Sequence, residues 1–61
     1  MTGDELKRIR LEMKLSQEKF AQLIGARPMQ VSKWETGRIS MSRLYIEKVE
    51  KVREENGIQL S

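Results

Sequence analysis

The sequence predicts an all-α fold, a small bundle of four helices with five as the alternative, followed by a short C-terminal tail. Three observations lead to this prediction. Apolar residues recur at helical spacing along most of the chain, helix-capping residues precede most of these stretches, and glycine follows most of them. Because the chain has 61 residues, we expect a single domain over 1–61 with a thin core.

The composition excludes several kinds of function. The chain has no Cys and no His, so disulfides, thiolate chemistry, Cys/His zinc sites and histidine acid–base catalysis are excluded. Twelve Lys and Arg outnumber nine Asp and Glu, and the net charge of +3 permits a polyanionic partner without establishing one. The sequence has no apolar run long enough to span a bilayer and no signal-peptide pattern. We therefore expect a cytoplasmic protein without membrane contact, and no cofactor, metal or small-molecule ligand is evident.

The first helix should begin at Thr2. Thr2 and Glu5 have the spacing of a capping box, in which each side chain accepts a hydrogen bond from the backbone N–H of the other residue. The apolar residues that follow at helical spacing are Leu6, Ile9 and Met13. We expect this helix to run to about Lys14.

A second helix is predicted over 17–24. Ser16 before it is a favourable N-cap, and Gly25 after it can take a left-handed conformation at little steric cost. Its expected inner face consists of Phe20, Leu23 and Ile24, with the small Ala21 beside them.

The third helix is predicted to begin at Pro28 and to end before Gly37. Proline suits the first helical position because its missing N–H would have no intrahelical partner there, and it restricts Arg27 to extended backbone. Val31, Trp34 and Glu35 point to one side of this helix, and Met29, Ser32, Lys33 and Thr36 point to the other. Residues 16–37 thus form a helix-turn-helix, whose second helix can lie in the major groove of DNA.

A longer last helix should begin at Ile39-Ser40. Ser40 would be its N-cap, Ile39 would pack against Leu44, and residues 56–57 would end it. Its apolar band consists of Met41, Leu44, Tyr45, Val49 and Val52, and Ile46 widens it.

Arg10 and Glu35 are charged residues on otherwise apolar faces of the first and third helices. Either charge would be unfavourable to bury alone, so we predict a salt bridge that joins the two helices. If the pair is buried, loss of one partner should destabilise the fold by about 3–5 kcal/mol. The alternative is that each side chain reaches separately to solvent. In both cases the two residues are structural and not catalytic.

The run LSQEKFAQLIGARPMQVSKWETG resembles the lambda-repressor-like family of helix-turn-helix proteins, also called the Cro or XRE type. The matching features are Arg10, Leu15-Ser16-Gln17, Phe20-Ala21, Ile24-Gly25, Val31-Ser32, Trp34-Glu35 and Gly37. The resemblance implies an all-α bundle that binds double-stranded DNA, usually as a two-fold symmetric dimer on a pseudo-palindromic operator. Members are commonly phage or bacterial repressors, antitoxins and autoregulators. By resemblance, Gln17 braces the DNA backbone, and the residues at the groove are Arg27, Pro28, Met29, Ser32 and Lys33.

Side-chain chemistry suggests a role for each residue expected at the DNA. Arg27 has a fork that matches guanine or phosphate, Lys33 could donate to guanine, and Met29 could contact a thymine methyl group. Further expected contacts come from Gln30, Ser32, Thr36, Arg38 and Arg43. The alternative is that the cations are merely solvated and that Met29 is a scattered surface apolar residue.

These expectations describe a sequence-specific transcriptional regulator, most simply a phage or bacterial repressor that can include its own gene among its targets. It would bind an inverted-repeat operator as a homodimer, with helix 28–36 in the major groove. The expected dimer seam consists of Ile46, Val49, Ile58 and Leu60. The tail at 58–61 either frays or pairs as a strand with a second copy.

Three alternatives to DNA binding differ in how well the sequence supports them. One alternative is an antitoxin or adaptor that binds another protein through the long last helix. An enzyme is disfavoured because the sequence has no phosphate-binding glycine loop and no convergent carboxylate cluster. RNA binding is a weaker alternative, because aromatic stacking residues are scarce.

Overall fold

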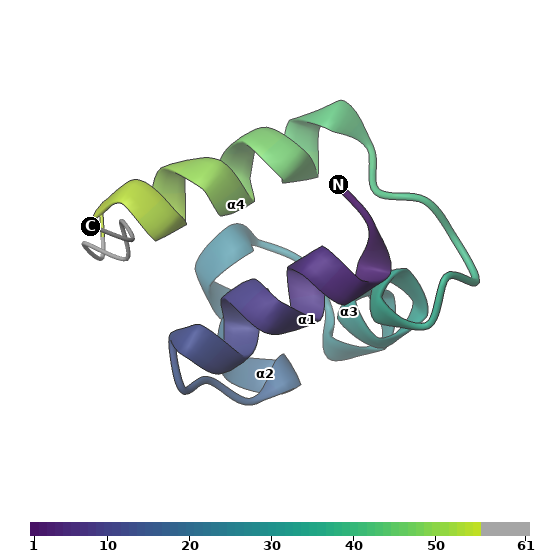
Figure 1. The fold of residues 1–61 in the computed structure, drawn as a ribbon, viewed down its shortest axis with the longest axis horizontal. Helices are drawn as coiled ribbons and strands as arrows, with labels where there is room; N and C mark the ends of the chain where they lie inside the picture. Colours follow the sequence, from purple (N-terminus) through teal and green to yellow (C-terminus); the bar gives the residue numbers. More distant parts are fainter. Residues whose placement is uncertain (56–61) are drawn as a thin grey trace.

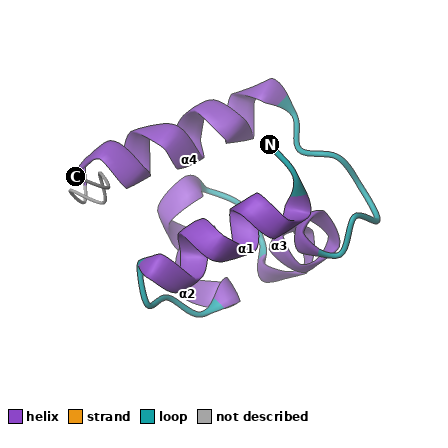
Figure 2. Cartoon of the chain, viewed as in Figure 1, coloured by secondary structure: helices purple, strands orange, loops and turns teal. Residues whose placement is uncertain are grey.

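A computed structural model describes residues 1–55, and these residues form four α-helices joined by turns and loops (Figures 1 and 2). The helices are α1 (Gly3–Glu12), α2 (Gln17–Ile24), α3 (Pro28–Glu35) and α4 (Arg43–Glu55). The described part of the chain contains no strand, so the predicted all-α fold is confirmed. α2 packs against α3 and α4, and α3 also packs against α1. The expected tail at 58–61 lies outside the described residues.

The N-terminus of α1 is closed by the predicted capping box. The Thr2 N–H donates to Glu5 Oε1 at 3.0 Å, and the Glu5 N–H donates to Thr2 Oγ1 at 3.1 Å. The hydrogen bond from the Thr2 backbone is the main cause that lowers the pKa of the Glu5 carboxyl group. The two bonds fix where α1 begins.

The C-terminus of α1 differs from the prediction, because the helix ends at Glu12 and not near Lys14. Lys14 has a left-handed backbone with φ of 58°. Its N–H bonds to the Leu11 carbonyl at 2.9 Å, and the Leu15 N–H bonds to the Arg10 carbonyl at 3.2 Å. This is the bonding pattern of a Schellman motif, which usually has glycine where this chain has lysine.

Replacing Lys14 with glycine should therefore stabilise the protein. A left-handed conformation costs an L-residue roughly 1–2 kcal/mol, and glycine relieves this cost. Glycine also gives the unfolded chain more conformational entropy, which opposes folding by about 0.4–1 kcal/mol. We expect a net gain of about 0.5–1 kcal/mol in the free energy of unfolding, measured in urea. Lys14→Ala is the control, because it removes the charge and keeps the Cβ. Equal stability of the two variants would contradict the prediction.

The predicted boundaries of α2 are confirmed, and α3 begins where expected. Ser16 Oγ accepts a hydrogen bond from the Lys19 N–H at 3.1 Å, and Gly25 has a left-handed φ of 71°. Arg27 is extended at the N-cap of α3, and Pro28 is the first helical residue. The end of α3 comes one residue early, because Thr36 is its C-cap. The turn at 25–27 thus sets α3 against α2.

The start of α4 is a correction to the prediction. The helix begins at Arg43, so the connection over 36–42 is longer than expected and Ser40 is not an N-cap. Ile39 and Leu44, expected to pack together, are 43% and 59% exposed. The reason is that the 36–42 connection leaves α3 and reaches the first turn of α4 as an irregular segment (Figure 1).

The core lies between α1, α2 and α3 and is closed by α4. Its buried apolar residues are Leu6, Ile9, Phe20, Ala21, Ile24, Val31, Trp34 and Val49. Leu23, expected on the inner face of α2, is 49% exposed, so that assignment is wrong.

The prediction of Val49 in a dimer seam is wrong, because its side chain is completely buried within one chain. A domain this small uses the central apolar residue of its last helix to close its own core. Ile46 is half-buried and lines a hollow with Gly3 and Trp34, so its place in a dimer seam stays a prediction. Ile58 and Leu60, the other two seam residues, lie outside the described residues.

Candidate nucleic-acid interface

The two sides of α3 differ sharply in burial. Val31 and Trp34 are 0% and 4% exposed, and the Trp34 ring lies 5.0 Å from the Tyr45 ring of α4. On the opposite side Met29 is 68% exposed. The side of α3 with Val31 and Trp34 is therefore packed into the core, and the side with Met29 is exposed to solvent.

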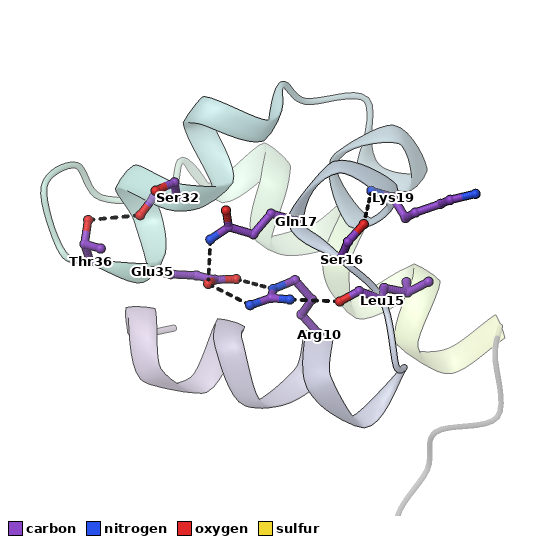
Figure 3. A network of polar contacts seen from close by, with 8 residues as sticks. All are labelled: Arg10, Leu15, Ser16, Gln17, Lys19, Ser32, Glu35 and Thr36. Atoms are coloured by element: carbon purple, nitrogen blue, oxygen red, sulfur yellow. Dashed lines mark hydrogen bonds and ion pairs between the residues drawn. The ribbon is translucent and has the colours of Figure 1, made fainter.

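A buried ion pair fixes the C-terminal end of α3 to α1. Arg10 Nε donates to Glu35 Oε2 at 2.6 Å, and Arg10 Nη2 donates to Glu35 Oε1 at 3.1 Å (Figure 3). The Arg10 and Glu35 side chains are 10% and 4% exposed. A third bond runs from Arg10 Nη1 to the Leu15 carbonyl at 2.8 Å, just before α2. The fork-like pairing restrains both the distance and the rotation between the two helices.

Gln17, expected at the DNA backbone, takes part in the same network. Its Nε2 donates to Glu35 Oε1 at 3.2 Å, and the side chain is half-buried (Figure 3). Because an amide group has two N–H donors, one donor remains for a phosphate at the N-terminus of α2. The bond also holds the start of α2 beside the end of α3.

Two polar side chains of the α3 region already have backbone partners. Gln30 Oε1 accepts a hydrogen bond from the Arg27 N–H at 3.0 Å. The Thr36 hydroxyl donates to the Ser32 carbonyl at 2.9 Å (Figure 3). Gln30 is left with its NH₂ donors, and Thr36 is left with acceptor lone pairs.

The cations expected at DNA occupy three places along the chain. Arg27 is exposed at the start of α3 and Lys33 is half-buried near its end. Arg38 is exposed directly after α3, and Arg43 is exposed at the first residue of α4, the far end of the connecting loop. Because Glu35 is neutralised by Arg10, these cations give the α3 face a positive potential.

The structure therefore brings most of the expected contact residues to one helix and its flanks. Pro28 is exposed and Ser32 half-buried at positions on the same helix, whereas Arg43 belongs to a separate helix. The reasoning from sequence missed the two side-chain bonds of Gln17 and Gln30. The Gln30 bond has a local signal, because Arg27 and Gln30 have the N-cap-to-N3 spacing of a capping box.

Residues 1–55 lack two other functional features. These residues contain no group of three or more carboxylate side chains placed to hold a metal ion. None of their helices has both the length and the apolar character needed to cross a membrane.

In a comparison with known protein families, residues 6–52 match the family described as helix-turn-helix. The matched residues cover most of α1, all of α2 and α3, and most of α4. No curated protein and no solved structure matches the chain.

Proposed function

The chain belongs to the lambda-repressor-like (Cro/XRE-type) helix-turn-helix family and is a regulator that binds double-stranded DNA, and from this premise we propose that it is a sequence-specific repressor. We further propose that 1–61 act as one domain with its DNA-binding core at 16–37. The observation that carries the proposal is the open, cationic face of α3, held from behind by Val31, Trp34 and the Arg10–Glu35 pair.

Contacts would divide into those that position the protein and those that read bases. Gln17 at the start of α2 and Arg38 after α3 suit the phosphate backbone, which fixes the orientation on the duplex. Met29 and Lys33 lie near the centre of the outer face of α3 and suit base edges. Arg27 and Arg43 would add phosphate contacts on either side. Pro28 has no N–H to donate, so it would contribute van der Waals contact alone.

The repressor would act as a homodimer on an inverted repeat. One short recognition helix reads only a few base pairs, and a second copy about 34 Å away along the duplex multiplies the specificity. The exposed apolar side chains Ile39 and Leu44, next to the half-buried Ile46, support a contact between copies near the start of α4. Bound over a promoter, the dimer would exclude polymerase and so repress transcription.

Selection of sites from random duplex DNA, followed by footprinting, tests this function. We expect an inverted repeat whose two halves are one helical turn apart, with an affinity that falls steeply with salt because phosphate contacts release counterions. Lys33→Ala should weaken operator binding by about 1–3 kcal/mol. Lys51→Ala, an exposed cation on α4, is the matched control and should bind normally. A wild-type chain that enriches no sequence would instead favour the protein-interaction alternative.

A further inference from the structure

The hydrogen-bonding groups left free on the outer face of α3 are mainly donors. Arg27 and Lys33 carry donors only. Gln30 is the one side-chain amide of α3, and the bond that its oxygen accepts from the Arg27 N–H holds this amide against the start of the helix. Glu35 is the one carboxylate of α3, and it is turned onto Arg10 with 4% of its side chain exposed. The face therefore has no free carboxylate, and its one amide is held in a capping bond.

The four bases present different hydrogen-bonding groups in the major groove and therefore require different side chains on such a face. Guanine presents two acceptors, and thymine presents an acceptor and a methyl group. Adenine presents an acceptor beside a donor, so two-point recognition requires a side chain with a free donor and a free acceptor. Cytosine presents a donor, which a carboxylate reads best. Ser32 and Thr36 carry hydroxyl groups, whose single oxygen lacks the separate donor and acceptor atoms with which an amide contacts adenine.

Resting on the proposed function, we propose that the outer face of α3 specifies guanine and thymine and makes no two-point contact with adenine. Lys33 donates to the O6 and N7 acceptors of a guanine, and Met29 covers a thymine methyl group. Gln30 is a positioning residue: its oxygen holds the first turn of α3, and its NH₂ group meets a phosphate. The capping bond at 3.0 Å thus keeps the Gln30 amide at the N-terminus of α3 and away from the two-point contact that Asn and Gln make with adenine.

Site selection with three full-length proteins tests the proposal. The wild type should enrich a guanine at one position of each half-site, by on the order of tenfold over other bases. Lys33→Gln places a free amide at that position and should change the preferred base there from guanine to adenine, with the rest of the motif unchanged. Circular dichroism of each protein verifies that the helices are intact.

Gln30→Glu is the second variant, because a carboxylate keeps an acceptor for the Arg27 N–H and removes the NH₂ donors. It should weaken binding to all sequences by a similar factor, roughly tenfold, and leave the motif unchanged. An adenine that the wild type requires and Gln30→Glu no longer selects would overturn the inference. So would a Lys33→Gln motif identical to that of the wild type. Failure of the wild type to enrich any sequence would overturn the proposed function and this inference together.

Discussion

Replacement of Arg10 with methionine is expected to lower the free energy of unfolding by about 3–5 kcal/mol. The reason is that the buried Glu35 carboxylate would lose its partner cation. Glu35 has 4% of its side chain exposed and would lose both hydrogen bonds from Arg10, with Gln17 as the remaining donor at 3.2 Å. The Leu15 carbonyl would lose its 2.8 Å bond at the same time. Because a domain of this size has only about 3–9 kcal/mol of total stability, the variant should be partly unfolded at room temperature.

Urea denaturation of four proteins measures this effect: the wild type, Arg10→Met, Glu35→Met and the double variant. Removing both charges leaves no unpaired ion, so the double variant should be more stable than either single variant. The cycle then gives the coupling energy of the pair. Glu35→Gln keeps the shape of the side chain and supplies a milder variant if Arg10→Met does not fold. A loss under about 1 kcal/mol for every single variant would contradict the buried ion pair.

Local features of the fold could be predicted because their causes lie within a few residues. Thr2, Ser16 and Gly25 each determine a helix end through their own side chain, or its absence, and all three occur where expected. Lys14 could not be predicted, because no property of lysine favours a left-handed backbone. Tertiary packing imposes that conformation where α1 must turn towards α2.

The rotation of α4 was not predictable for a different reason. Its sequence carries apolar residues on more than half of its circumference, so several rotations would bury a comparable apolar area. The structure buries Val49 completely and leaves Leu44 59% exposed. The start of the helix was placed too early because Ser40 is as good a local cap as any residue near it.

In the candidate site, the Arg10–Glu35 pair could be predicted because two opposite charges stood on two apolar faces. The bond from Gln17 to Glu35 could not, because it depends on how closely the start of α2 approaches the end of α3. That approach is set by packing between helices and has no signal in the spacing of residues. The contacts with DNA follow from side-chain chemistry and stay predictions.

Gly3→Ala is expected to destabilise the protein by roughly 1–3 kcal/mol, although alanine is the better helix former by up to about 1 kcal/mol. A Cβ at Gly3 would lie 2.5 Å from the Trp34 carbonyl oxygen and 2.6 Å from that of Glu35. Both neighbours are backbone atoms of the last turn of α3, so no side chain can rotate away to make room. The N-terminus of α1 would have to move off α3, and this would also strain the Arg10–Glu35 pair between the same two helices.

Urea denaturation separates this steric effect from helix propensity. Lys7→Ala, on the exposed side of α1, changes the same helix without touching α3 and should alter stability by less than about 0.5 kcal/mol. In Gly3→Ala, the amide resonances of Trp34 and Glu35 should shift most, because α1 would be displaced at those residues. DNA affinity should fall as well, since the end of α3 is part of the proposed interface. A Gly3→Ala protein more stable than the wild type would mean that helix propensity outweighs the close approach of the two backbones.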